Sequence, residues 1–303
     1  MYSVVIPVYN SELSLRELFD GIREVFTGLS AEFEVIFVDD GSRDNSWQVL
    51  QQLKKEHPET IVAITLAKNF GQHNATLCGF SFAKGQFIIS IDDDLQIPPA
   101  EIRKLIICQE ENEADVVYGY FGPGKQHSVI RNAGSRLTKK TSVVMTGGPG
   151  EGSSFRLIRS DLVKKILNHH QNFIYLDEVI LWYTDSIAFE KVEHRKRKYR
   201  QSGYTLAKLV KLAGNILLYY STIPLKFLVY GGFILSFIFS CIGIYFIIKK
   251  LFFNVPLGYT SLIVAILFST GIILFSLGVI GEYLSRIYQV QNKKPPYSIR
   301  KVL

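Results

Sequence analysis

Three consecutive carboxylates, Asp92, Asp93 and Asp94, follow an apolar stretch at residues 86–90 and precede Gln96. Carboxylates at this density repel one another and lose hydration at the end of a strand. A hard divalent cation such as Mg²⁺ or Mn²⁺ would neutralise them and would accept their oxygens as ligands. The alternative for an isolated acidic triplet is a solvated turn. The segments around the triplet favour the chemical interpretation.

Two kinds of sequence pattern alternate over residues 1 to about 165. Short runs rich in β-branched and aromatic residues predict strands, and runs with helical spacing predict helices. Their alternation predicts an α/β domain with a mostly parallel sheet. The expected strands are 3–7, 33–38, 61–65 and 87–91, and the expected helices are 13–26 and 44–55, the second capped by Ser42 or Asp44.

Each of the four expected strands ends in a polar cluster. The carboxyl ends of parallel strands meet at one edge of a sheet, and ligands bind there. Carboxylates, amides and a glycine turn that meet at this edge could hold a nucleotide and its metal ion. The clusters are Tyr9-Asn10, the run 39–42, the run 68–73 and the triplet 92–94. Within the third cluster, His73 is expected to pack or to form hydrogen bonds and not to act in catalysis.

Other nucleotide-binding classes are disfavoured by the motifs. No G-x-G-x-x-G or Walker sequence is present, which argues against dinucleotide redox chemistry and P-loop hydrolysis. The formal net charge is +7, but the basic residues concentrate beside the apolar runs of the C-terminal third, so nucleic acid is not an expected partner. The three cysteines are dispersed and fit reduced thiols.

Two long apolar runs, 225–248 and 259–280, predict membrane spans. Each exceeds the roughly 20 residues that cross ~30 Å of hydrocarbon. The connector 249–258 is too short for a domain, so the spans are expected to form a hairpin over 225–281 with both ends on one side.

Basic residues set the expected orientation of this hairpin. They precede the first span and follow the second, against only Lys249 and Lys250 in the connector. The positive-inside rule therefore places a domain of residues 1–203 and a tail of residues 282–303 in the cytoplasm. Residues 204–224 mix apolar side chains with lysines and are expected to form interfacial amphipathic helices, or to pack between subunits. Residues 2–7 run straight into a strand, so no secretory signal is expected.

Four ordered motifs lie at residues 5–10, 38–44, 69–73 and 92–99. They resemble those of the family 2 inverting glycosyltransferases with a GT-A fold. Three further segments lie near the C-terminus, at residues 221–225, 278–288 and 294–297. They resemble the tail of bacterial polyprenyl-phosphate glycosyltransferases, a group related to dolichol-phosphate mannose synthase and to the undecaprenyl-phosphate glucose and aminoarabinose transferases.

The resemblance implies a role for particular residues on the donor side. Asp40 would contact the nucleoside, and the nucleotide pocket would also use Pro7, Tyr9, Glu12, Asp92 and Asp93. The same resemblance gives Asp92, Asp94 and Gln96 as ligands of the Mg²⁺ or Mn²⁺ ion that bridges the donor diphosphate.

The resemblance also implies an acceptor site and a catalytic set. Arg131 and Ser135 would bind the phosphate of the lipid acceptor, with Lys125 or His127 supplying charge where relatives carry arginine and this chain has Phe121. Arg197 would reach the donor phosphate, although it lies in a basic run that could equally face anionic lipid. The catalytic residues implied are Asp94, Arg131 and Arg197.

The implied reaction is metal-dependent, inverting transfer of a hexose-type sugar from a nucleotide-sugar, UDP more than GDP, to undecaprenyl phosphate. The enzyme would be a homo-oligomer in the bacterial inner membrane with its catalytic domain in the cytoplasm. A phosphate acceptor is already ionised, so it needs positioning and charge control and no strong base. Asp177 is expected to be solvated or to bind a sugar hydroxyl, and the segment 152–157 lacks the aspartate of many members.

Two alternatives remain at this point. A family 2 transferase could elongate a polysaccharide or a lipid-linked glycan, although the Gln-x-x-Arg-Trp motif of polymer synthases is missing. The chain could also be a membrane scaffold that keeps the fold without catalysis. A scaffold has no physical need to crowd three carboxylates, which favours the enzyme.

Overall fold

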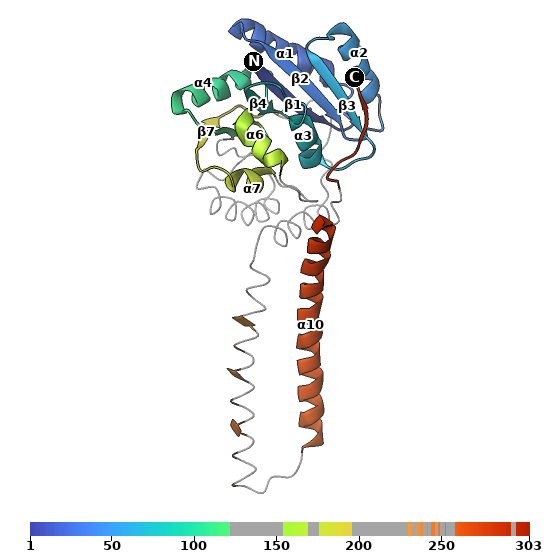
Figure 1. The fold of residues 1–303 in the computed structure, drawn as a ribbon, viewed down its shortest axis with the longest axis vertical. Coiled ribbons are helices and arrows are strands. Elements are labelled where there is room, and N and C mark those ends of the chain that lie inside the picture. The colour runs from blue at the N-terminus through green and yellow to red at the C-terminus, as the bar shows by residue number, and fades with distance from the viewer. Residues whose placement is uncertain are drawn as a thin grey trace. The chain divides into compact units, whose positions relative to one another are not determined.

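The computed structural model describes residues 1–121, 154–168, 176–195, 258–291 and 295–303, together with single helical positions between 230 and 252 (Figure 1). The chain divides into two compact units. The first comprises residues 1–203 and 295–303, and the second comprises residues 204–294.

The first unit contains an eight-stranded sheet among its described residues, in the order β7-β5-β6-β4-β1-β2-β3-β8. The four central strands β4, β1, β2 and β3 run parallel, as expected, but β6 is antiparallel to both β4 and β5, and β8 is antiparallel to β3. Six of the eight strands therefore point in the same direction, as expected for a mostly parallel sheet, while β6 and β8 make the sheet mixed. The strands are β1 Tyr2–Val8, β2 Phe33–Asp39, β3 Ile61–Leu66, β4 Phe87–Ser90, β5 Val116–Tyr120, β6 Arg156–Arg159, β7 Ile187–Lys191 and β8 Ile299–Val302.

Helices cover both faces of this sheet (Figure 1). Helices α1, α2 and α4 pack on one face. Helix α3 packs against β1 and β2 on the other face, where it contacts α6, and α6 in turn contacts α7. The helices of this unit are α1 Leu15–Leu29, α2 Ser46–Glu56, α3 Gln72–Phe80, the short 3₁₀ helix Pro99–Glu101, α4 Ile102–Asn112, α6 Ser160–Leu167 and α7 Leu176–Leu181.

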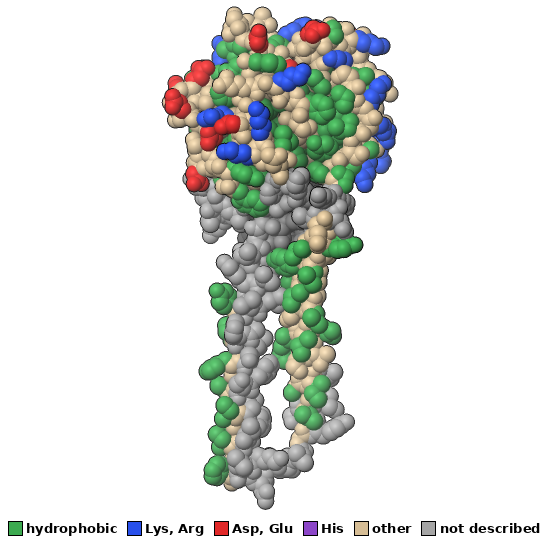
Figure 2. All heavy atoms as spheres, in the orientation of Figure 1, with side chains coloured by type: hydrophobic (Ala, Val, Ile, Leu, Met, Phe, Trp, Pro, Cys, Tyr) green, Lys and Arg blue, Asp and Glu red, His purple; other side chains and the backbone are tan. Residues whose placement is uncertain are grey.

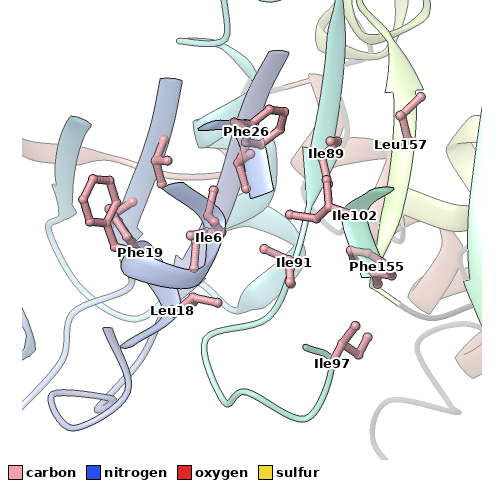
Figure 3. Packing of buried hydrophobic residues seen from close by; sticks show 14 of the residues in the cluster. Ile6, Leu18, Phe19, Phe26, Ile89, Ile91, Ile97, Ile102, Phe155 and Leu157 are labelled. Atoms are coloured by element: carbon pink, nitrogen blue, oxygen red, sulfur yellow. The ribbon is translucent and has the colours of Figure 1, made fainter. Parts of the chain in front are cut away.

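The core explains why the parallel strands are apolar throughout. Side chains on alternate positions of a strand point to opposite faces, and here both faces are covered. In Figure 3, Ile6 of β1 and Ile89 of β4 point toward Phe19 and Phe26 of α1. Val5, the neighbour of Ile6, faces α3, where the backbone at Gly79 approaches it closely. Both faces of β1 are therefore sealed from water.

The start of α2 differs from the expected cap. Asn45 occupies the N-cap position and makes no hydrogen bond to the helix with its side chain, so neither Ser42 nor Asp44 is the cap. Asp44 still forms hydrogen bonds with the first turn of α2. Its Oδ1 accepts from the backbone N of Ser46 at 3.0 Å and from the Ser46 hydroxyl at 2.6 Å.

The C-terminal segment forms one edge of the eight-stranded sheet. Strand β8 pairs with β3, and Leu303 and Ala63 exchange two backbone hydrogen bonds of 2.9 and 3.3 Å. The Arg300 guanidinium donates to the carbonyl of Ala67 at 2.7 Å, just beyond the end of β3. The last nine residues, expected only as part of a cytoplasmic tail, thus complete the first unit.

The second unit is described mainly through α10, Tyr259–Gln291. Among the described helices, α10 is the one long and apolar enough to cross a membrane, with a mean hydropathy of 1.4 over Phe268–Ser285. Its apolar side chains are exposed along its length (Figure 2). The expected span 259–280 lies within α10, whereas the expected span 225–248 and the interfacial segment 204–224 lie largely or wholly outside the described residues. The two-helix hairpin therefore stays a prediction.

Candidate functional site

The four polar clusters meet where β1 and β4 end. The sheet order reverses direction at this pair, since β2 and β3 lie on one side of β1 and β4 lies on the other. A crevice at such a reversal is the usual ligand site of an open α/β sheet. The triplet following β4 contacts the loop following β1, because the backbone N of Tyr9 donates to Asp93 Oδ2 at 2.9 Å.

Pro7 fits its central strand because of where β4 ends. The backbone carbonyl of Val5 points to the β4 side of β1 and accepts a hydrogen bond from the backbone N of Ile91. The backbone N of residue 7, two positions further along the strand, points to the same side. The pairing of β1 with β4 stops at Val5 and Ser90, so no carbonyl of β4 lies opposite Pro7. The missing N–H of proline is not needed there. The two strands can diverge at this point.

Asp40 is held at the end of β2 by the loop that follows β3. Its two oxygens accept from the backbone N of Phe70 at 2.6 Å and of Gly71 at 2.8 Å. Gly71 adopts φ 91°, which favours glycine. Burial raises the pKa of Asp40 to about 6, against the lowering effect of these two hydrogen bonds. Asp40 is thus an almost enclosed carboxylate that titrates near neutral pH.

Glu12 ties the loop after β1 to the start of α2. Its Oε2 accepts from the backbone N of Asn45 at 2.8 Å, while its own backbone N donates to Asp44 Oδ2 at 3.3 Å. The structure therefore places Glu12 between two loops of the site.

The three carboxylates of the triplet have different environments. Asp92 accepts from Gln72 Nε2 and from the Ser154 hydroxyl, each at 2.6 Å. Asp93 faces Tyr9, and burial, aided by the charges of its two acidic neighbours, raises its pKa to about 7 despite hydrogen bonds that lower it. Asp94 Oδ1 accepts from the backbone N of Gln96 at 3.1 Å. The middle carboxylate is therefore directed into the protein.

Gln96 connects the triplet to the segment after β7. Its carbonyl accepts from the backbone N of Arg195 at 2.7 Å, and its side-chain amide donates to the Arg195 carbonyl at 3.3 Å. Residue 195 thus lies beside Gln96 and leads toward Arg197. Arg197, like Lys125, Arg131 and Ser135, lies outside the described residues. Their acceptor and phosphate roles stay predictions.

A buried arginine beside the triplet was missed by the sequence analysis. Arg156 on β6 is only 2% exposed and forms an ion pair with Asp177 on α7. Asp177 keeps 19% of its side chain exposed and is engaged in an ion pair that was not expected, and its contact with a sugar hydroxyl stays a prediction. Tyr118 of β5 stacks with the guanidinium, whose centre lies 5.7 Å from the ring. Burial lowers the pKa of nearby His73 to about 4, which keeps that side chain neutral.

The donor set at the triplet suits a cation shared with a substrate. No group of three His, Cys, Asp or Glu side chains in the described part of the chain is arranged to hold a metal ion by itself. Mg²⁺ commonly takes only one or two protein carboxylates and completes its shell with substrate phosphates and water. Asp92 and Asp94, which supply hard oxygen donors, fit that kind of site.

Comparison with known proteins defines the class. The mixed α/β sheet with its acidic triplet at the switch point is of the GT-A type. This fold is shared by a solved glucosyl-3-phosphoglycerate synthase from Mycobacterium tuberculosis, in complex with Mn²⁺, UDP and phosphoglyceric acid. The TM-score is 0.50 at 17% identity, over 72% of this chain and 77% of that one. The chain belongs to glycosyl transferase family 2, whose model matches residues 3–179, and it is a glycosyltransferase.

Two curated relatives extend the likeness beyond the family domain. Undecaprenyl-phosphate 4-deoxy-4-formamido-L-arabinose transferase of Shewanella sediminis is 33% identical over 99% of this chain and 92% of its own length. The enzyme of the same name from Proteus mirabilis is 32% identical over 99% and 93%. The likeness therefore covers the two apolar runs and the C-terminal strand as well as the GT-A domain, and it supports the predicted polyprenyl-phosphate glycosyltransferase type.

Proposed function

We propose that this chain transfers a sugar from a nucleoside diphosphate sugar to a polyprenyl phosphate, with inversion at the anomeric carbon. The observation that carries the acceptor is the likeness to undecaprenyl-phosphate sugar transferases across 99% of the chain. A likeness restricted to residues 3–179 would support only the family. Undecaprenyl phosphate is the acceptor we propose.

Asp40 supports the donor side of the proposal. A carboxylate fixed by two backbone N–H groups has little freedom to rotate, so it presents a constant acceptor surface to a nucleoside. A uracil ring offers an N–H donor that such a carboxylate accepts, and the solved synthase that shares this fold is in complex with UDP, so UDP is the donor we favour over GDP. Pro7 at the end of β1, and Tyr9 and Glu12 on the loop that follows it, would line the pocket.

Asp92, Asp94 and Gln96 would hold a Mg²⁺ or Mn²⁺ ion. When bound, the ion would stabilise the charge of the departing nucleoside diphosphate as a Lewis acid. Asp92 is kept in one orientation by Gln72 and Ser154, so its geometry is set before the substrate arrives.

On the acceptor side, the protein must bind the lipid phosphate and balance its negative charge. The phosphate of the acceptor carries its own negative charge, so the chain must position it and screen its charge, and needs no strong base. Arg131, Ser135 and Lys125 are the proposed phosphate ligands, and Arg197 is the proposed partner of the donor phosphate. The contact of Gln96 with residue 195 brings the chain that leads to Arg197 beside the metal ligands.

We also propose that the membrane segments bring the site to its lipid substrate. Residues 1–203 and 295–303 belong to one unit and share one sheet, so they lie on the same side of a membrane. A chain that leaves and returns to one side crosses an even number of times. If α10 crosses once, a second crossing must lie within 204–258, where the sequence predicts the span 225–248. The homo-oligomer stays a prediction.

The decisive experiment is sugar transfer by the purified full-length protein. Radiolabelled UDP- and GDP-sugars, including hexoses and the arabinose derivative named for the relatives, are offered with undecaprenyl phosphate and Mn²⁺ or Mg²⁺. We expect label in the lipid fraction from one UDP-sugar, abolished by EDTA. Asp94→Ala should lose about 100-fold or more of this activity, because losing the ion removes several kcal/mol of stabilisation.

Asp20→Ala is the matched control for this experiment. Asp20 is an exposed carboxylate on α1 paired with Arg23, and its removal should leave the rate unchanged. Transfer to a glycan acceptor instead of the lipid phosphate would favour the elongating alternative. Binding of UDP without transfer to any acceptor would contradict the proposed function.

A further inference from the structure

The Arg156–Asp177 ion pair lies on the same face of the sheet as Gln72 and His73, next to the metal ligands and not among them. Arg156 of β6 lies directly between Ser90 of β4 and Tyr118 of β5 in the strand register. Asp177 reaches it from α7, which packs on α6. Four elements thus converge on one guanidinium.

A chain of hydrogen bonds leads from this ion pair to Asp92. Arg156 Nε donates to the Ser90 hydroxyl at 3.3 Å, and the Ser90 hydroxyl donates to the Ser154 carbonyl at 2.5 Å. The Ser154 hydroxyl then donates to Asp92 Oδ2 at 2.6 Å. Every member except Asp92 and Ser154 is almost fully enclosed or ion-paired. The chain has few alternative geometries.

Stability alone does not explain a charged pair at this position. Removing two charges from water costs free energy that their attraction often fails to return, and well-packed apolar pairs are commonly as stable. Groups that hold metal ligands in place, by contrast, commonly change metal affinity or activity by about 10- to 100-fold when removed. The hydrogen-bonded link to Asp92 favours this second role.

We propose that the Arg156–Asp177 pair positions Asp92 for the cation and diphosphate, acting through Ser90 and Ser154. The inference rests on the proposed function, since it assumes that Asp92 binds the cation. Neither Arg156 nor Asp177 touches the reacting atoms. Both are positioning residues, and their loss should weaken binding of the cation in the presence of UDP without unfolding the domain.

The test replaces both charges at once with apolar residues. In the full-length protein, Arg156→Met together with Asp177→Leu avoids an unpaired buried charge, so the unfolding midpoint followed by tryptophan fluorescence should stay near that of the wild type. The dissociation constant of Mn²⁺ with saturating UDP, measured by electron paramagnetic resonance of free Mn²⁺, should rise by about tenfold or more. A folded double variant that binds Mn²⁺ within about twofold of the wild type would overturn the proposal.

An exposed ion pair on the same elements supplies the matched control. Arg159 of β6 and Asp161 of α6 lie 3.1 Å apart at the surface. Arg159→Met with Asp161→Leu also replaces one arginine and one aspartate by apolar residues away from Asp92, although it removes a second ion pair of Arg159 with Asp115 at 3.3 Å, and it should leave the Mn²⁺ affinity unchanged. An equal loss in this control would mean that the ionic character near β6, and not the link to Asp92, sets the affinity, which also contradicts the proposal.

A second pair of variants tests the link if the buried double variant does not fold. Ser90→Ala and Ser154→Ala change no charge, and each should raise the Mn²⁺ dissociation constant. Because the two hydroxyls act in series, the effect of combining them should be smaller than the product of the single effects. Independent effects, or no effect of Ser90→Ala, would refute the relay.

The readout also separates this inference from the proposed function. Mn²⁺ and UDP binding is measured without a lipid acceptor, so failure of the wild type to glycosylate undecaprenyl phosphate does not affect it. A wild type that transfers sugar but binds no Mn²⁺ in the presence of UDP would overturn the inference and leave the reaction standing.

Discussion

Asp40 is almost completely buried and has a pKa of about 6. Its titration should therefore make the free energy of unfolding depend on pH. The pKa of Asp40 is raised from 3.8 mainly by burial. Between these two pH values the folded state binds more protons than the unfolded state, so the free energy of unfolding falls as pH rises through the window. A shift of this size corresponds to at most about 3 kcal/mol, lost by pH 7.

Asp40→Asn should remove this pH dependence. Asparagine does not titrate, but its amide can accept from only one of the Phe70 and Gly71 N–H groups, which costs about 1–3 kcal/mol at every pH. We expect the variant to be less stable than the wild type at pH 4.5 and to approach or exceed it at pH 7.5. Denaturant unfolding followed by the two tryptophans measures the difference. A difference that does not change with pH would contradict the assigned pKa.

Some residues of the site could be predicted from the sequence and others could not. Asp40 and the triplet could be located from residue type and strand position, because parallel strands bring their carboxyl ends together whatever else the chain does. Arg156 and Asp177 could not, because their pairing depends on how β6 and α7 return across the sheet. The sequence around Asp177 has no pattern that distinguishes an ion-paired carboxylate from a solvated one. Buried charge is a property of the tertiary arrangement.

At the element scale, the contact of α3 with the sheet depends on Gly79. A Cβ atom at this position would lie 2.3 Å from Val5 Cγ1 and 3.2 Å from Val38 Cγ2. Both valines are buried and have stiff side chains. Gly79→Ala should therefore destabilise the domain by about 1–3 kcal/mol, despite the better helix propensity of alanine. Because α3 carries Gln72, the affinity for Mn²⁺ with UDP should also fall.

Gly28→Ala is the control for this change. Gly28 lies in α1, where the nearest atom to an added Cβ is the flexible end of Arg103 at 3.4 Å. The substitution should be neutral or should stabilise the domain by up to about 1 kcal/mol. Denaturant midpoints of both variants provide the comparison. Equal midpoints would mean that α3 can move away from the sheet without cost, contrary to the close packing described here.

Strand β8 protects the open edge of β3, and a pair of proline substitutions tests this role. Leu303 and Ala63 form a hydrogen-bonded pair, so in an antiparallel ladder the N–H of Lys301 faces β3 and that of Val302 faces away. Lys301→Pro should detach the strand and expose an edge prone to association. Val302→Pro should be tolerated. Light scattering and the denaturant midpoint distinguish them, and equal behaviour would argue against the pairing.

The elements themselves were predictable to different extents. The four parallel strands and the helices α1 and α2 follow from continuous apolar runs and helical spacing, and the structure has them within three residues of the expected bounds at either end. The antiparallel β6 and β8 are as short as β4, but each contains two basic residues, so neither gives the continuous apolar run that predicts a buried strand. Their presence adds two reversed strands to an otherwise parallel sheet. Short strands gain their stability from neighbours that are distant in sequence.

At the scale of the whole molecule, the return of the C-terminus to the first sheet constrains the membrane topology. Residues 299–302 share a sheet with residues 61–66, so both lie on one side of any membrane. If the apolar helix α10 between them crosses a membrane, a second crossing is needed. The sequence predicts that crossing at residues 225–248, and the positive-inside rule predicts a cytoplasmic sheet.

Single cysteines test this topology in intact bacterial cells. Leu13, which is 64% exposed in the first unit, and Asn254, in the predicted connector, are each replaced by cysteine in a Cys241→Ser background, where Cys78 and Cys108 are buried. A membrane-impermeant maleimide should label Asn254→Cys in intact cells and Leu13→Cys only after permeabilisation. Val302→Cys should behave as Leu13→Cys does. Labelling of all three from outside would exclude a cytoplasmic catalytic domain. Labelling of none would mean that the connector does not reach the outer surface, and the chain would then not form a spanning hairpin.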